Sequence, residues 1–95
     1  MQRGQRTVTE SLPIPSAAKT DPNSVELIRV WMTESNQFFA INAQIWDDPA
    51  FWGGALVDLA KNVSRAFEHN YDITFEDALA LVKRAFDAEI ENPTD

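Results

Sequence analysis

Residues 25–45 read VELIRVWMTESNQFFAINAQI, and this stretch decides the fold. Residues 25–32 and 38–45 are rich in β-branched and aromatic side chains, which are typical of strands. The polar run between them, centred on Ser35–Asn36, is typical of a turn. The stretch therefore predicts an antiparallel β-hairpin.

The register of this hairpin follows from its apolar residues. A turn at Ser35–Asn36 produces three apolar pairs on one face, namely Met32 with Phe39, Val30 with Ile41, and Ile28 with Ala43. A slip by one residue would move every side chain to the other face, so this agreement favours the register. The opposite face is mixed in character and holds Leu27, Arg29, Trp31, Phe38, Ala40 and Asn42. In this register Arg29 and Asn42 are cross-strand neighbours.

Two helices are expected after the hairpin. Asp48 is a typical N-cap residue and Pro49 suits the first helical position. Apolar residues then recur at helical spacing up to His69–Asn70, where we expect Asn70 to end the helix in a left-handed conformation. Gly53–Gly54 weakens this helix, and we expect the close approach of another backbone to compensate.

The second helix begins after Thr74, whose hydroxyl can cap the first turn with Asp77 at the third position. Its apolar stripe continues to Ile90, and Asn92–Pro93 ends it. The sequence thus predicts an α+β fold of order ββαα, with an antiparallel hairpin packed against two antiparallel helices.

The domain boundaries follow from composition. Residues 1–24 are rich in Gln, Thr, Ser and Pro, and Leu12-Pro13-Ile14-Pro15 favours an extended backbone. We therefore expect an extended or flexible tail over residues 1–24 and a single domain over residues 25–95.

Charge and composition exclude several classes of protein. The net charge is −7, with +1 on residues 1–24 and −8 on the remainder, so we expect no nucleic-acid binding. No apolar run is long enough to span a membrane, and none follows Arg3 and Arg6 as in a secretion signal, which predicts a cytoplasmic protein. With no cysteine and one histidine, we expect no metal site and no cofactor.

Several strings resemble a known family of short proteins. They are Leu12-Pro13-Ile14-Pro15, Arg29-Val30-Trp31, Trp46-Asp47-Asp48-Pro49-Ala50-Phe51-Trp52-Gly53 and Asp58-Leu59-Ala60. The chain resembles domain of unknown function 5076, found mainly in rhizobia and related alphaproteobacteria, from about Leu12 to its end. The resemblance implies a bacterial source and a free-standing domain, and it implies no activity or catalytic residues.

No catalytic set is expected from the residues either. His69 is the single side chain suited to general base chemistry near neutral pH, and no nucleophile accompanies it in a recognisable motif. Asp47–Asp48 suggests a carboxylate pair, but the capping role of Asp48 explains it. The aromatic residues Trp46, Phe51 and Trp52 suit a ligand pocket or, as we prefer, a core.

The mixed face of the hairpin is the strongest functional feature. A face that bears Leu27, Trp31, Phe38 and Ala40 exposes apolar area to water, which favours a partner protein, and a second copy of the chain in particular. We therefore predict a non-enzymatic interaction module or a homodimer. In the homodimer the two hairpins either pack face to face through Trp31 and Phe38 or pair edge to edge into a continuous sheet. The alternative is a small anionic ligand bound by Arg29 and Asn42 on the same face.

Overall fold

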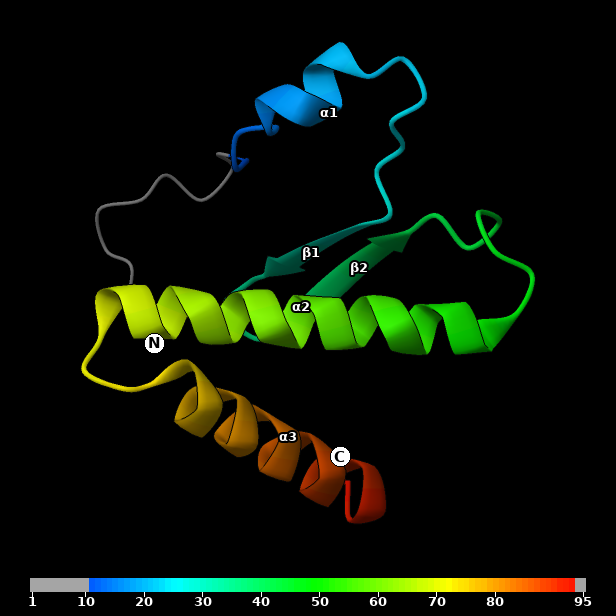
Figure 1. The fold of residues 1–95 in the computed structure, drawn as a ribbon. Helices are drawn as coiled ribbons and strands as arrows, with labels where there is room; N and C mark the ends of the chain where they lie inside the picture. Colours follow the sequence, from blue (N-terminus) through cyan, green and yellow to red (C-terminus); the bar gives the residue numbers. More distant parts are fainter. Residues whose placement is uncertain (1–10, 94–95) are drawn as a thin grey trace. The chain divides into compact units, whose positions relative to one another are not determined.

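The computed structural model describes residues 11–93 of the chain (Figure 1). The elements in chain order are α1 (Ser16–Thr20), β1 (Ile28–Met32), β2 (Gln37–Ile41), α2 (Pro49–Asn70) and α3 (Phe75–Glu91). This confirms the predicted α+β class and the order ββαα. The chain divides into two compact units, Met1–Ile45 and Trp46–Asp95, each described separately below. The single domain expected over residues 25–95, with the hairpin packed on the helices, stays a prediction.

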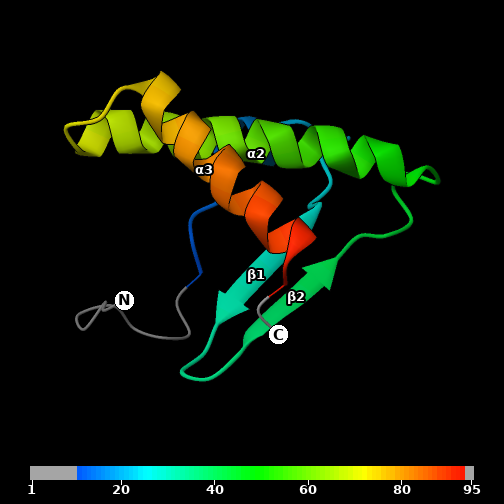
Figure 2. The same cartoon turned by 90° about the horizontal axis from the view of Figure 1, so that it is seen from below.

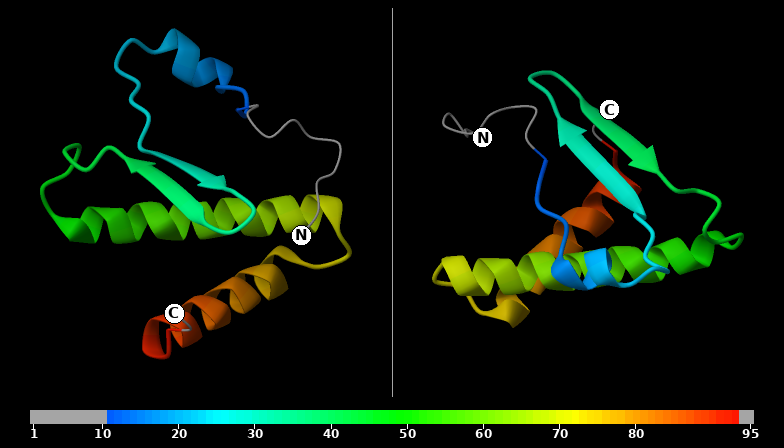
Figure 3. Two further views of the ribbon diagram at one scale, coloured as in Figure 1. Left: turned by 180° about the vertical axis from the view of Figure 1, so that it is seen from behind. Right: turned by 90° about the horizontal axis from the view of Figure 1, so that it is seen from above.

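The segment expected to be extended contains one short helix. In α1, the N–H groups of Ala18 and Lys19 both donate to the carbonyl of Pro15, at 3.0 and 3.1 Å. Alanine and lysine are strong helix formers, which explains a turn of helix here. Residues 1–10 of the expected tail lie outside the described residues. The loop that follows α1 leads into β1 (Figure 3).

The hairpin forms as predicted, but its register differs by two residues. β1 and β2 are antiparallel and pair Ile28 with Ile41, Val30 with Phe39, and Met32 with Gln37. The predicted partners of these β1 residues, Ala43, Ile41 and Phe39, were therefore wrong. Because the difference is even, each side chain keeps its predicted face.

The turn explains the difference in register. The Thr33 N–H donates to the Asn36 carbonyl at 2.8 Å, which puts the turn at Glu34–Ser35, one residue earlier than predicted. The Thr33 hydroxyl also donates to that carbonyl and accepts from the Asn36 N–H, at 3.1 and 3.2 Å. These local hydrogen bonds of the Thr33 side chain pair Thr33 with Asn36, so Asn36 lies in the ladder and not in the turn.

The second unit is a pair of helices that run in opposite directions (Figure 2). Asp48 caps α2 as predicted, its Oδ1 accepting from the Ala50 N–H at 2.9 Å. Thr74 caps α3 as predicted, its hydroxyl accepting from the Asp77 N–H at 3.1 Å. Glu68, near the end of α2, adds a second cap by accepting from the Phe75 N–H at 3.0 Å.

The helix α2 ends at Asn70 as predicted, but the predicted backbone conformation of that residue was wrong. No residue other than glycine has a positive φ within residues 11–93, so Asn70 does not end the helix in a left-handed conformation. Its side chain instead donates to the Ala66 carbonyl at 2.8 Å and satisfies an acceptor of the last turn. Among the described residues, a Cβ added to Gly53 or Gly54 meets nothing within 4 Å, and the compensating approach of another backbone stays a prediction.

Small side chains are the most buried residues of the helical unit. Ser64 in α2 is fully buried and Ala78 in α3 is 4% exposed. The Ser64 hydroxyl donates to the Ala60 carbonyl of its own helix at 2.8 Å, so its burial leaves no unpaired donor. Beside them, the Arg65 guanidinium lies 5.3 Å from the centre of the Phe75 ring, which joins α2 to α3.

Candidate interaction surface

The structure brings all six predicted site residues onto one face of the hairpin, here called the mixed face. Trp31 lies directly opposite Phe38, and Arg29 lies opposite Ala40. Leu27 and Asn42 extend this ladder, since the Asn42 N–H donates to the Leu27 carbonyl at 2.9 Å. The residues expected at an interface are therefore neighbours, although Trp31 faces Phe38 rather than Ala40.

The mixed face is only partly shielded. Leu27, Trp31 and Asn42 are half-buried, whereas Ala40 is exposed. Phe38 has 55% of its surface exposed, which is high for an aromatic side chain at the centre of a sheet face. Apolar area thus remains open to water where the sequence predicted it.

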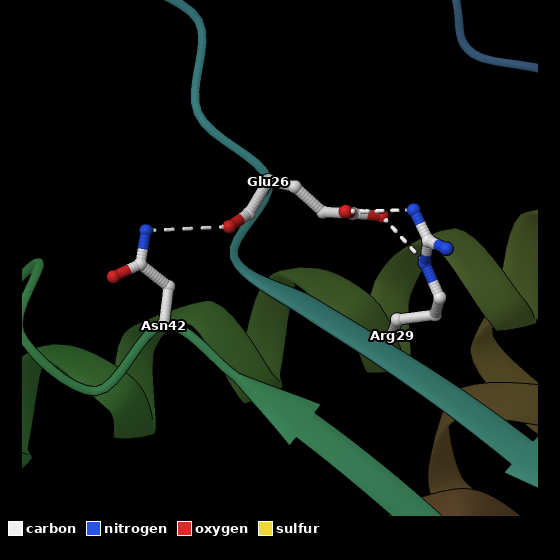
Figure 4. Close-up of polar contacts among 3 residues, drawn as sticks. All are labelled: Glu26, Arg29 and Asn42. Atoms are coloured by element: carbon white, nitrogen blue, oxygen red, sulfur yellow. Dashed lines mark hydrogen bonds and ion pairs between the residues drawn. The ribbon is translucent and has the colours of Figure 1, made fainter.

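Arg29 and Asn42 are diagonal rather than cross-strand neighbours, and both contact Glu26 (Figure 4). The Arg29 Nε and Nη2 donate to the two carboxylate oxygens of Glu26, at 3.1 and 2.9 Å. The Asn42 Nδ2 donates to the Glu26 main-chain carbonyl at 3.4 Å. Sequence reasoning missed Glu26, although an acidic residue three positions before an arginine is a detectable signal. The Glu26 carboxylate already accepts hydrogen bonds from the Arg29 guanidinium, the group that would bind an anionic ligand.

The other face of the hairpin, here called the apolar face, is also open. It bears Ile28, Val30, Met32, Phe39 and Ile41, whose exposed fractions are 38%, 47%, 64%, 56% and 54%. Isolated exposed apolar residues are normal on a protein surface, but five on one face of a two-stranded sheet form a contiguous patch. Both faces of the hairpin therefore present apolar side chains.

The outer edges of the two strands add unpaired backbone groups. Thr33 with Asn36 and Leu27 with Asn42 are hydrogen-bonded pairs, and such pairs alternate along an antiparallel ladder. It follows that Ile28, Val30 and Met32 direct their N–H and C=O groups away from β2. In the part of the chain that the structure describes, these groups have no hydrogen-bond partner.

A groove runs along this outer edge of β1. Its volume is about 720 Å³, and residues 11–18 form one wall while residues 24–32 form the other. A smaller groove, of about 440 Å³, lies across both strands near Leu27 and Asn42. The larger groove is lined mainly by apolar residues on both walls, so it suits an apolar occupant better than a charged one.

The aromatic residues at the start of the helical unit pack against one another. The ring centres of Trp46 and Trp52 are 5.1 Å apart in an edge-to-face arrangement, and those of Trp46 and Phe51 are 6.1 Å apart. Trp46 and Trp52 are half-buried while Phe51 is 57% exposed. None of the three lines either groove described above, which favours packing over a ligand pocket.

The other residues considered for catalysis or metal binding are His69 and the consecutive acids Asp47 and Asp48. His69 is exposed in the last turn of α2. Asp48 is the N-cap of α2, as described above, which accounts for one of the two consecutive acids. Among the described residues, no three histidine, aspartate or glutamate side chains form a group that could hold a metal ion. No helix over residues 11–93 is long and apolar enough to cross a membrane.

These features define a small ββαα protein whose hairpin presents apolar side chains on both faces and has an open edge. The chain belongs to the family described as domain of unknown function DUF5076, whose model matches residues 11–94. A search among curated proteins finds no match.

The solved structures that match include one that is similar over most of the chain. It is described as "a putative pyruvate dehydrogenase" from the photosynthetic bacterium Rhodopseudomonas palustrus CGA009. The two sequences are 27% identical, with a TM-score of 0.72, and the likeness covers 90% of this chain and 88% of the other. Because the two shares are nearly equal, the two chains have similar lengths.

Proposed function

We propose that this protein is a non-enzymatic assembly module that forms a homodimer through its hairpin. The observation that carries the proposal is that one two-stranded sheet exposes Phe38, beside the half-buried Trp31, on one face and five apolar residues on the other. We further propose that it works in the cytoplasm of an alphaproteobacterium. The bacterial source of the similar structure supports the bacterial part of this proposal.

Both faces of the hairpin bear apolar side chains, so covering one face leaves the other in water. Burying apolar surface contributes roughly 25 cal/mol per Å², and a lone two-stranded hairpin is marginal in water. Helices of the same chain can cover one face of this hairpin, as the predicted fold requires. A second apolar face then remains, and a second copy of the chain would bury it.

An enzymatic role has less support. The name pyruvate dehydrogenase is that of the similar protein, and a residue set for such chemistry is not evident in this chain. The sequence has no cysteine and a single histidine, and that histidine is exposed at the end of α2. Acid–base catalysis requires a group positioned beside the reacting atoms, usually within a cleft.

A small anionic ligand on the mixed face is the alternative function. The Arg29–Glu26 pair is half exposed on both sides, with side-chain exposures of 50% and 60%, and such surface pairs are weak. A ligand carboxylate or phosphate could therefore replace Glu26 at the guanidinium. A thermal-shift panel of anionic metabolites on the native protein, Glu26→Gln and Arg29→Ala tests this. The alternative requires stabilisation that increases in Glu26→Gln and is lost in Arg29→Ala.

The primary test is the molar mass in solution. Light scattering after size-exclusion chromatography, over a tenfold concentration range, should give about twice the chain mass of 10.7 kDa. Trp31→Lys should lower this mass, because it places a charge on the mixed face. Gln44→Lys is the matched control, since Gln44 is an exposed loop residue and the charge change is identical. A monomer at every concentration, or a Trp31→Lys dimer of unchanged stability, would contradict the proposal.

A further inference from the structure

The two units differ in charge in a way that selects where two copies can meet. Residues 1–45 contain four basic and four acidic residues and are neutral overall. Residues 46–95 contain four basic and eleven acidic residues, so the whole net charge of −7 lies in the helical unit. Two copies repel each other through their helices but can approach through their hairpins without net repulsion.

Within the neutral unit, the outer edge of β1 is unprotected. Edge strands that avoid association usually carry lysine, proline or a bulge. β1 reads Ile-Arg-Val-Trp-Met, and the charge of its one basic residue, Arg29, is matched by Glu26 at 2.9 Å. The groove along this edge provides space for another strand beside β1, against Leu12 and Ile14 of the opposite wall. These two side chains are 77% and 60% exposed.

We infer that the occupant of this groove is β1 of a second copy, paired antiparallel about a twofold axis at Val30. This inference rests on the proposed homodimer and assigns its interface to the contact between the two β1 strands, here called the seam. The outward-facing residues would form three hydrogen-bonded pairs: Val30 with Val30 of the second copy, and Ile28 with Met32 of the second copy twice by symmetry. Two hairpins then form one four-stranded sheet, above the size at which a sheet with an apolar face becomes stable.

The register brings complementary side chains together on the mixed face. Arg29 lies opposite Trp31 of the second copy, and Trp31 lies opposite Arg29 of the second copy. Residues directly opposite in a non-hydrogen-bonded pair are the closest neighbours across a seam. A guanidinium over an indole ring is a favourable contact, so this register is supported by side chains as well as by backbone groups.

Disulfide trapping tests the seam directly, since the native chain has no cysteine. In the inferred register, Val30→Cys places two Cα atoms about 5.5 Å apart, within the range of a disulfide. Phe39→Cys is the matched control, because Phe39 lies on the same face with its backbone groups at the outer edge of β2. Oxidation of the full-length protein should convert nearly all Val30→Cys to a covalent dimer and leave Phe39→Cys unlinked.

A proline pair gives a second, noncovalent readout. Val30→Pro removes an N–H that points away from β2, so the hairpin ladder keeps its own bonds. We expect the dimer Kd to increase about tenfold or more, because two seam hydrogen bonds are lost by symmetry. Phe39→Pro should leave Kd unchanged, with circular dichroism confirming that both variants fold.

The outcomes separate the seam from the proposed function. A native dimer that links through Phe39→Cys, or through neither cysteine, with Kd insensitive to Val30→Pro, overturns the β1 seam and leaves homodimerisation intact. A native protein that is monomeric throughout overturns both. A dimer that links through Val30→Cys alone and weakens with Val30→Pro supports both.

Discussion

The hairpin unit and the helical unit differ in how their backbone N–H and C=O groups are hydrogen-bonded. In the interior of α2 and α3 each peptide group bonds within its own helix, and the first turns are capped by Asp48 and Thr74. In the hairpin, every second residue of each strand directs its backbone N–H and C=O groups outward, where they form no hydrogen bond with a described residue. The helical unit is therefore locally complete, whereas the hairpin has outward backbone groups that the proposed homodimer would pair.

The charge distribution follows the same division. The helical unit carries the net charge of −7, and the hairpin unit is neutral. A charged surface remains soluble and separate, and a neutral apolar surface associates. Under the proposed function, stability comes from the helical unit and assembly from the hairpin unit, and the following variants test this assignment.

The largest effect is expected in the helical unit. Ala78→Leu adds volume at a position that is 4% exposed, so it should lower the free energy of unfolding by about 1–3 kcal/mol. Urea titration followed by circular dichroism measures the change. Ala80→Leu on the exposed surface of the same helix is the control and should have little effect. Equal effects of the two would mean that Ala78 does not pack between helices.

The second variant addresses the hairpin unit. Ile14→Ser removes an exposed apolar side chain from the groove wall, so it should raise the dimer Kd by up to about tenfold while folding is unchanged. Sedimentation equilibrium measures the Kd, and Ser11→Ala at the same wall is the control. A loss of unfolding free energy with no change in Kd would assign Ile14 to the monomer instead.

Removing the first cap tests whether the helical unit is locally complete. Asp48→Ala should destabilise α2 by about 1 kcal/mol, because the Ala50 N–H loses its acceptor. Asp47→Ala, which removes the neighbouring carboxylate, should have a much smaller effect. The midpoint of thermal unfolding distinguishes the two, and equal shifts would argue against the specific capping role.

Gly54→Ala should act in the opposite direction. Nothing lies within 4 Å of an added Cβ, so the variant should stabilise α2 by up to about 1 kcal/mol. Thermal unfolding and dimer mass are measured together. Stabilisation without a change in mass fits the assignment of assembly to the hairpin. A weaker dimer would instead place a partner backbone beside this glycine.

The smallest effect is expected from pH. The hydrogen bond and charge of Asp87, 2.6 Å away, raise the pKa of Lys83 above its usual 10.5. A pKa that is higher in the folded state contributes stability at pH values below 10.5, and that stability is lost as the pH rises through the folded-state pKa. Because the pair is exposed, the native protein and Lys83→Met should differ only slightly at neutral pH and converge in alkaline solution.

Much of the local structure was predictable because its causes are local. Asp48 and Thr74 cap the helices that follow them, and Asn92 ends α3 as expected. The membership of each hairpin face was also correct, since side chains alternate in any strand. The register was wrong by two residues, because the bonds between Thr33 and Asn36 compete with the turn signal at Ser35–Asn36.

The candidate site was predicted in part for a similar reason. A register shift by an even number of residues keeps every side chain on its face. The predicted interface residues therefore still share one face, namely Leu27, Trp31, Phe38 and Ala40. The pairing of Arg29 with Glu26 was missed, because Glu26 precedes the strand and its direction does not follow the strand alternation. The groove along β1 was also missed, since its walls are segments that no periodic pattern connects.

The amino-acid sequence by itself determined the class, the order of elements, the helix caps and the apolar character of both hairpin faces. These depend on interactions between residues a few positions apart, which repeat along the chain and can be detected there. The tertiary structure alone decided which residues pair across the hairpin, what occupies the Arg29 guanidinium, and that the outer edge of β1 faces an open groove. Those features depend on contacts between segments that are distant in the sequence. Local preferences allow more than one strand register, and the hydrogen bonds of the turn select one of them.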